Sequence, residues 1–208
     1  MGTLPAESID LLSKESAETL LKPYLETIRD CIKAGWDAWI SFGSLAPDLR
    51  APLSKRSRAT FVYDHIVYNI QAKFYKNPRV GLLQKAGFLN LEIDGGSEAR
   101  AILRIKKLDR KNRARNYPTN QQVLFSMQLN LPGWPKDATR LIAGYKLDLT
   151  ETEIHEYLVT LPIGSNVEWF FEITEGVPKI QEMPVRDADE LKTAVRAIGI
   201  KKVSEDEK

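Results

Sequence analysis

The sequence predicts an α+β domain in which helices pack on one face of a mainly antiparallel sheet. In the first third of the chain, apolar residues recur at spacings of three and four, which is typical of amphipathic helices. After about residue 80, apolar and polar residues alternate in several segments, which is typical of strands with one buried face. Helices followed by strands, with a helix between two groups of strands, favour the α+β class.

The first helix is expected from about Pro23 to Ser41, because proline suits the first turn of a helix. Its buried stripe consists of Tyr24, Leu25, Ile28, Cys31, Ile32, Gly35, Trp39 and Ile40. A connector containing two prolines follows. Ser54 or Ser57 then caps a second helix, and Asn77-Pro78 ends it. The apolar positions of this second helix are Val62, Ile66, Ile70 and Phe74.

A β-hairpin is expected next. The alternation at 89–93 and at 101–105 predicts two strands, and the segment 94–97, Asp-Gly-Gly-Ser, supplies the turn. Thr119 with Gln122 resembles a capping box that opens a short helix through about Leu129. The two strands of the hairpin should share one apolar face.

Three further strands and a helix are expected toward the carboxyl end. Alternation predicts strands at 141–149, 157–161 and 167–173, which together describe a sheet with one solvated face. Asp187 with Glu190 opens a last helix that stops at Gly199. Residues 1–200 are therefore expected to form one α+β domain, and residues 201–208 a disordered tail.

Composition sets limits on function. Hydrophobic residues make up 43% and charged residues 28% of 208 residues, as in a globular protein. No apolar run is long enough for a membrane span, and the amino terminus lacks the features of a secretory signal, so a cytoplasmic location without membrane attachment is expected. Cys31 is the only cysteine, which rules out an internal disulfide, and two histidines cannot complete a Cys/His zinc cage.

The most uneven charge lies between Arg100 and Arg115, where eight cations are opposed only by Asp109, although the formal net charge of the chain is +2. Such a stretch favours a surface for a polyanion. A second basic group stands at the start of the second helix, where cations oppose the helix dipole. The candidate nucleic-acid-binding residues are Arg104, Lys106, Lys107, Arg110, Lys111, Arg113, Arg115, Lys55, Arg56 and Arg58.

These cations are also compatible with roles other than nucleic-acid binding. Arg104 and Lys106 fall on the polar face of a strand and can pair with Glu92 and Asp94 across the hairpin. The loop cations can bind nucleic acid, form a plain solvated loop, or make ion pairs between subunits of a homo-oligomer. They have no acidic neighbour in sequence except Asp109.

Two aromatic residues are candidates for stacking. Tyr117 precedes Pro118 beside the basic stretch, and Trp134 stands in a loop between two prolines. An aromatic ring beside cations can stack on a base or pack at a subunit interface.

The order of helix, hairpin, strand and helix resembles the core of the PD-(D/E)XK nucleases, in which carboxylates on adjacent strands hold magnesium. Asp94 fits the first carboxylate and Lys106 the lysine. Arg104 occupies the position of the second carboxylate, so the essential ligand is missing. We expect no catalytic residue, no metal site and no cofactor. His65 and His155 are interpreted as a helix residue and a surface residue without catalytic partners.

Three segments, RSRATFVYDHI, RIKKLDRKNRARNYPTNQQ and LPGWPKDATRLIAGYKLD, are similar to parts of uncharacterised bacterial proteins associated with phage-type repressor and metallopeptidase genes. The similarity covers residues of about 55 to 175. It implies a setting in the regulation of phage, mobile elements or stress.

The sequence thus predicts a non-catalytic cytoplasmic regulatory protein that binds nucleic acid through a basic strand and loop at 100–115. One alternative is a protein-interaction subunit that modulates a repressor or toxin, with an acidic protein as partner. Another is a divergent PD-(D/E)XK-like nuclease.

Overall fold

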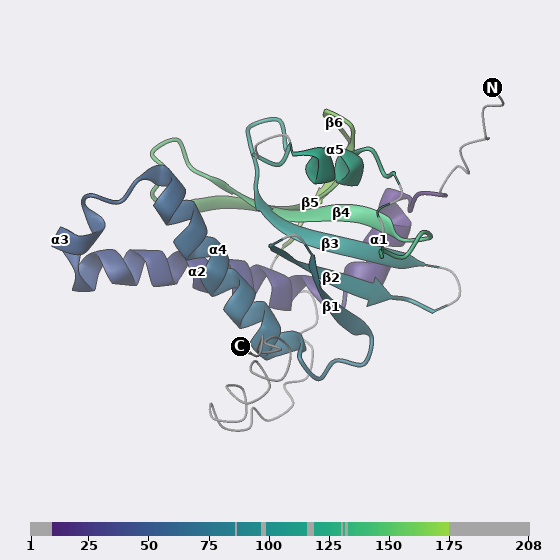
Figure 1. Cartoon of the computed structure of the whole chain (residues 1–208), viewed down its shortest axis with the longest axis horizontal. Helices are drawn as coiled ribbons and strands as arrows, with labels where there is room; N and C mark the ends of the chain where they lie inside the picture. Colours follow the sequence, from purple (N-terminus) through teal and green to yellow (C-terminus); the bar gives the residue numbers. More distant parts are fainter. Residues whose placement is uncertain are drawn as a thin grey trace, which may run out of the picture.

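The structure is a computed structural model that describes residues 10–85, 87–96, 99–115, 119–129, 131 and 133–174 (Figure 1). Its helices are α1 (Lys14–Leu21), α2 (Leu25–Leu45), α3 (Pro47–Arg50), α4 (Lys55–Phe74) and α5 (Asn120–Ser126). Its strands are β1 (Val80–Lys85), β2 (Phe88–Asp94), β3 (Arg100–Lys107), β4 (Thr139–Leu147), β5 (Ile154–Ile163) and β6 (Asn166–Glu172). The fold class is α+β, as the sequence predicts.

The six strands form one sheet in chain order, β1-β2-β3-β4-β5-β6. Neighbouring strands are antiparallel except β3 and β4, which run parallel with Leu103 opposite Leu141. A parallel pair needs a long crossover connection. Here the crossover contains residues 108–138, which include the last four cations of the basic stretch and α5.

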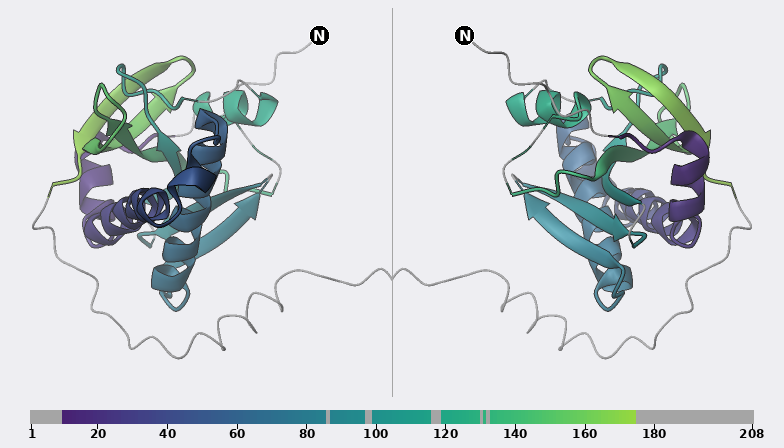
Figure 2. Two further views of the ribbon diagram at one scale, coloured as in Figure 1. Left: turned by 90° about the vertical axis from the view of Figure 1, so that its left-hand side faces the viewer. Right: turned by 90° about the vertical axis from the view of Figure 1, so that its right-hand side faces the viewer.

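The main core lies between one face of the sheet and α1, α2 and α4 (Figures 1 and 2). Alternate residues of β3 and β4, such as Leu103 and Leu141, point into it and are fully buried. The two long helices pack closely because α2 has a glycine at the contact. A Cβ on Gly35 would lie 2.4 Å from Cγ1 of Ile66 in α4, so a larger residue there would push the helices apart.

A second, smaller apolar cluster covers the opposite face of the central strands. Phe125 of α5 and Trp134 of the following loop pack against Ile102, Ile142 and Leu158. Figures 1 and 2 show α5 on the other side of the sheet from α2 and α4. The prediction that this sheet face is solvated is therefore wrong for the central strands, because the β3–β4 crossover folds back over it.

Most of the predicted elements are confirmed, with boundaries shifted by a few residues. Ser54 caps α4 by accepting a hydrogen bond from the backbone N–H of Ser57, and Thr119 caps α5 in the same way through Gln122. Helix α1 and strand β1 were not predicted as separate elements. The predicted helix at 187–199 and tail at 201–208 lie outside the described residues. Within the described part of the chain, no helix is long and apolar enough to cross a membrane.

Candidate functional site

The cations of the crossover lie on a compact loop at residues 109–115, called here the basic loop. Leu108 and Ala114 form an antiparallel bridge at its base. Asp109 closes the loop, because its carboxylate accepts the backbone N–H groups of Lys111 and Arg113 at 2.8 and 3.0 Å and the guanidinium of Arg113 at 2.7 Å. Asn112 has a φ of 62°, which lets the chain turn back toward the sheet.

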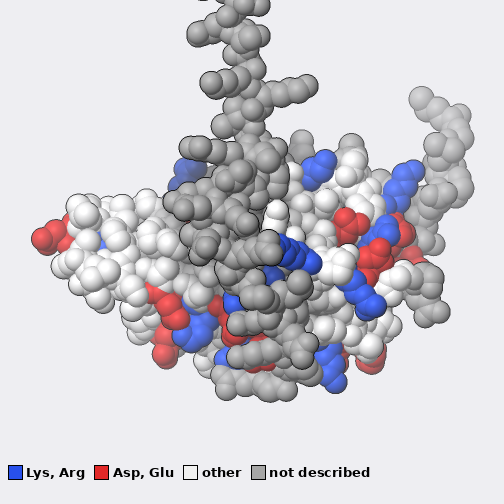
Figure 3. Space-filling model, turned by 90° about the horizontal axis from the view of Figure 1, so that it is seen from below, with Lys and Arg blue, Asp and Glu red and all other residues white. Residues whose placement is uncertain are grey.

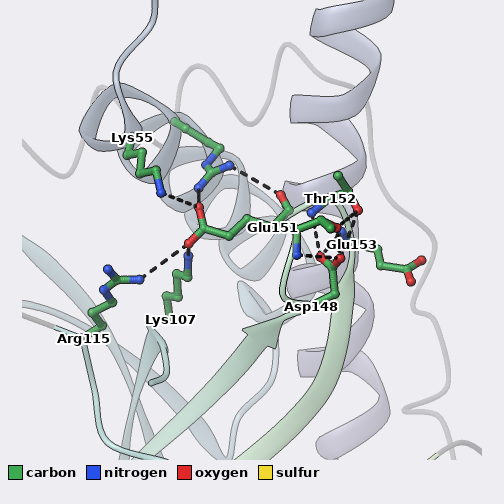
Figure 4. Close-up of polar contacts among 9 residues, drawn as sticks. Lys55, Lys107, Arg115, Asp148, Glu151, Thr152 and Glu153 are labelled. Carbon is green, nitrogen blue, oxygen red and sulfur yellow. Dashed lines mark hydrogen bonds and ion pairs between the residues drawn. The ribbon is translucent and has the colours of Figure 1, made fainter. Parts of the chain in front are cut away.

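Four cations from three separate segments converge on one carboxylate, that of Glu151 in the turn between β4 and β5 (Figure 4). We call these five residues the Glu151 cluster. The shortest nitrogen–oxygen distances to the carboxylate are 2.5 Å for Arg58, 2.9 Å for Lys107, 3.3 Å for Lys55 and 3.6 Å for Arg115. The cluster joins the start of α4, the end of β3 and the basic loop.

The pKa of Glu151 reflects these contacts. Hydrogen bonds from Lys107 and then Arg58 lower the pKa of Glu151 to about 2. Burial lowers the pKa of Lys107, and Glu151 partly opposes that change. One negative charge cannot balance four positive charges, so the Glu151 cluster itself carries an excess of positive charge.

Asp148 stands in the same turn as Glu151 but serves a different role. Its carboxylate accepts the backbone N–H groups of Thr150, Thr152 and Glu153. Figure 4 shows these contacts directed into the turn rather than toward the cations. Asp148 therefore fixes the turn that presents Glu151.

The sequence showed only Asp109 as an acidic neighbour of the loop cations, and two of these cations form ion pairs in the structure. Arg113 pairs with Asp109, and Arg115 pairs with Glu151 from a distant part of the chain. Arg110 and Lys111 on the basic loop and Arg56 on α4 are exposed. Within the part of the chain that the structure describes, these three cations form no ion pair. They are the candidates best placed to meet an external anion.

Arg104 was predicted to contact nucleic acid, and its burial contradicts that prediction. It is 0% exposed and lies beneath α5, opposite Asn90 in the register of β2 and β3. Its Nε donates to Oδ1 of Asn90 at 2.8 Å, and its Nη1 donates to Oε1 of Gln122 at 3.1 Å. Its guanidinium also lies 4.1 Å from the ring centroid of Phe125. A phosphate on the surface cannot reach it.

The predicted pairing of Arg104 and Lys106 with Glu92 and Asp94 is also wrong. The register places Glu92 opposite Ile102 and Asp94 opposite Arg100, and both carboxylates form ion pairs with Arg100. Lys106 is half-buried, with its Nζ 3.6 Å from the ring centroid of Phe88. Burial, followed by the charge of Arg104, lowers the pKa of Lys106 to about 8.

The structure describes only one of the two residues predicted to stack on a base. Trp134 is 8% exposed and packs edge-on against Phe125, so it cannot stack on a base in this structure. The interpretation of Trp134 as a stacking residue is therefore wrong. Tyr117 lies outside the described residues.

The positions matched to the nuclease core have an arrangement unlike a metal site. Asp94 pairs with Arg100 and accepts the backbone N–H of Gly96. Arg104, at the position of the second carboxylate, is enclosed by aromatic rings. Among the described residues, no group of three His, Cys, Asp or Glu side chains is arranged to hold a metal ion. His155 is a surface residue, with its side chain 69% exposed.

Three residues of this region were missed in the sequence. Glu151 gave no signal, because 44 positions separate it from Lys107. Arg140 is fully buried on the α5 face of β4, and its guanidinium nitrogens have no hydrogen-bond partner among the described residues. Thr160 on β5 is also fully buried, with its hydroxyl similarly unpartnered. Alternation placed Thr160 on the polar face of its predicted strand, but it gave no information on what covers that face.

Comparison with known proteins gave no match: no family model, no curated protein and no solved structure is similar to this chain.

Proposed function

We propose that this protein binds nucleic acid through a cationic surface formed by the basic loop and the first turn of α4. The observation that carries the proposal is the Glu151 cluster, in which four cations share one carboxylate. The single carboxylate neutralises only one of these four positive charges. The excess of positive charge beside Arg56, Arg110 and Lys111 is what a phosphate backbone would neutralise.

The local backbone supports the same proposal. Lys55, Arg56 and Arg58 lie in the first turn of α4, where unpaired N–H groups and the helix dipole already create a positive potential. No acidic residue is present in that turn. Cations at this end are unfavourable for the helix alone; Glu151 offsets part of that cost at Lys55 and Arg58, and a bound anion would offset the rest. The role would be regulatory binding rather than catalysis.

The proposal is tested by measuring how the affinity for DNA depends on salt, with and without the four cations of the basic loop. About four phosphate contacts by Arg110, Lys111, Arg113 and Arg115 give a slope of log affinity against log salt near −3.6 on duplex DNA. Replacing all four with alanine should flatten the slope and weaken binding to every sequence alike. Fluorescence anisotropy across a salt series measures both quantities.

A matched control removes the same charge elsewhere. Lys14, Lys22, Lys33 and Lys76 are exposed and lie on or beside α1, α2 and α4, outside the basic loop. Their fourfold alanine variant should keep a slope close to that of the wild type. A wild-type slope near zero, or equal losses in the two fourfold variants, would remove nucleic acid as the favoured ligand.

One observation favours the rival function, a protein-interaction subunit. Leu45 at the end of α2 and Leu49 in α3 are 86% and 66% exposed. Figure 3 shows few charged side chains at the end of the molecule formed by these two helices. Exposed apolar residues that lie together are typical of protein contacts. Leu45→Ser with Leu49→Ser would abolish such a contact and leave nucleic-acid binding unchanged.

A further inference from the structure

A cavity of about 660 Å³ opens beside the basic loop, between that loop, α5 and the turn joining β5 to β6. The backbone N–H of Gly164 in this turn donates to the carbonyl of Ser126 in α5 at 2.9 Å, which ties two of its walls together. The volume lies in the range of pockets that hold small organic groups. We call it the α5 pocket.

Apolar side chains form its walls. Val123 lies on α5 and Met127 is the C-cap residue of that helix, and they are 43% and 50% exposed. Pro162 and Val167 face the same cavity from β5 and β6. Exposed apolar residues on one side of a short helix, opposite an apolar strand edge, form a slot suited to a flat group with apolar faces.

The lining also holds polar groups that the protein does not satisfy. The hydroxyl of Thr160 is buried, and the described residues provide it with no hydrogen-bond partner. The same is true of Oδ1 of Asn112 in the basic loop. Both atoms have almost no accessible surface, so a ligand reaches them only when the side chains that cover them shift. Leaving a buried polar group unpaired costs free energy, and a ligand that reaches these atoms gains by supplying the missing partner.

Cations connect this cavity to the proposed binding surface. Arg113 and Arg115 line the pocket, and Arg115 also belongs to the Glu151 cluster. Gln122, another lining residue, accepts a hydrogen bond from the buried guanidinium of Arg104. Asp109 also lines the pocket and pairs with Arg113, so Arg115, which shares Glu151 with three other cations, is the lining cation best placed to meet an anionic group.

We propose that the α5 pocket receives one unstacked base of a single-stranded nucleic acid whose phosphates contact the basic loop. This inference rests on the proposed function and specifies the form of nucleic acid. A base has apolar faces and a hydrogen-bonding edge, which match the walls and the unpaired groups of Thr160 and Asn112. A duplex keeps its bases stacked and would have to unpair one to fill the pocket. Single strands are therefore preferred.

Fluorescence anisotropy with a twelve-nucleotide single strand and its duplex, at one salt concentration, tests this preference. The wild type should bind the single strand about tenfold more tightly, as expected for one inserted base. Thr160→Val removes the hydroxyl at nearly constant volume, and Val123→Trp fills the slot from an exposed position. Each variant should lower the single-strand affinity to that of the duplex and leave the duplex affinity unchanged.

Two controls separate binding from folding. Thr160→Ser keeps the hydroxyl and should retain the single-strand preference. Leu45→Trp adds the same kind of bulk as Val123→Trp at a position 86% exposed on the distant end of α2, and should bind like the wild type. Thermal unfolding of each variant shows whether a loss of affinity reflects a loss of structure.

The possible results of these experiments distinguish a base-binding pocket from the proposed nucleic-acid binding by the cationic surface. Equal binding of single strand and duplex, with Thr160→Val and Val123→Trp unchanged, would overturn the base-binding pocket and leave the cationic surface standing. No salt-dependent binding of either form by the wild type would overturn both. A single-strand preference lost in both pocket variants, and kept in both controls, supports the inference.

Discussion

The guanidinium of Arg104 lies 4.1 Å from the ring centroid of Phe125, and within the described residues it has no carboxylate partner. Phe88 and Trp134 place two more rings 5.1 and 5.7 Å from the same guanidinium. Burial is the main cause that lowers the pKa of Arg104, to about 10, which still leaves it charged at neutral pH. Aromatic faces and two neutral amide oxygens thus replace a counter-ion.

We expect Arg104→Met to leave the free energy of unfolding within about 1 kcal/mol of the wild type or to raise it, because methionine fills similar space without burying a charge. Arg104→Ala should lower it by about 2–5 kcal/mol, because it leaves a cavity under α5. Urea unfolding measures both. A large loss in Arg104→Met would show that the charge itself stabilises the fold, and a loss of nucleic-acid affinity in that stable variant would contradict the burial of Arg104.

Arg104 shows how far the sequence can predict this fold. Alternation correctly placed it on the face of β3 opposite the main core, beside Ile102. Alternation carries no information on what covers that face. The face is covered by α5, which belongs to the crossover connection between the parallel strands β3 and β4. The sequence predicted a mainly antiparallel sheet and gave no sign of the parallel β3–β4 pair, whose long crossover carries α5 over this face.

Glu151 shows the same limit for the candidate site. The basic residues were found because they are neighbours in sequence. Their carboxylate partner lies in the β4–β5 turn, so only the register of the sheet brings it to Lys107. Elements that depend on local signals were predicted well, as the caps of α4 and α5 show.

Lys106 gives a prediction of pH dependence. Its pKa is about 8 in the folded protein and 10.5 for an unperturbed lysine, so the unfolded chain binds more protons between these values. The free energy of unfolding contributed by Lys106 should therefore rise as the pH increases from about 8 to 10.5. Subtracting the curve of Lys106→Met from that of the wild type isolates this contribution. A flat difference across the window would show that Phe88 and solvent keep the ammonium ion as stable as in the unfolded chain.

Gln128 should be important for stability. It is 7% exposed; its Nε2 donates to the carbonyls of Arg140 and Pro162 at 2.9 and 3.1 Å, and its Oε1 accepts the N–H of Arg140 at 2.9 Å. Gln128→Ala leaves these buried backbone groups unpaired and should lower the free energy of unfolding by about 2–4 kcal/mol. Gln128→Glu should cost more at neutral pH, because a carboxylate faces two carbonyl oxygens. If Gln128→Glu and the wild type unfold at similar urea concentrations, the side chain of Gln128 does not form these hydrogen bonds.

Glu151→Gln should strengthen binding of nucleic acid while weakening the fold. The variant removes the carboxylate shared by Lys55, Arg58, Lys107 and Arg115, so their positive charge becomes available to phosphates. A lowered pKa means that the contribution of Glu151 to stability is complete above about pH 4.5 and is lost as the pH falls toward 2. The difference between wild type and variant in the free energy of unfolding should therefore shrink over that window.

Glu153→Gln is the matched control, since it removes the same charge from the same turn. In Figure 4 the side chain of Glu153 points away from the four cations. Anisotropy with a single-stranded oligonucleotide should show a gain of a few-fold in affinity for Glu151→Gln, and a clearly smaller change for Glu153→Gln. Equal gains would mean that only the net charge of the protein matters. A folded Glu151→Gln variant with a lower affinity would contradict this prediction. It would mean that Glu151 holds the cations in position, and that their ordered arrangement, rather than their excess charge, recognises the phosphates.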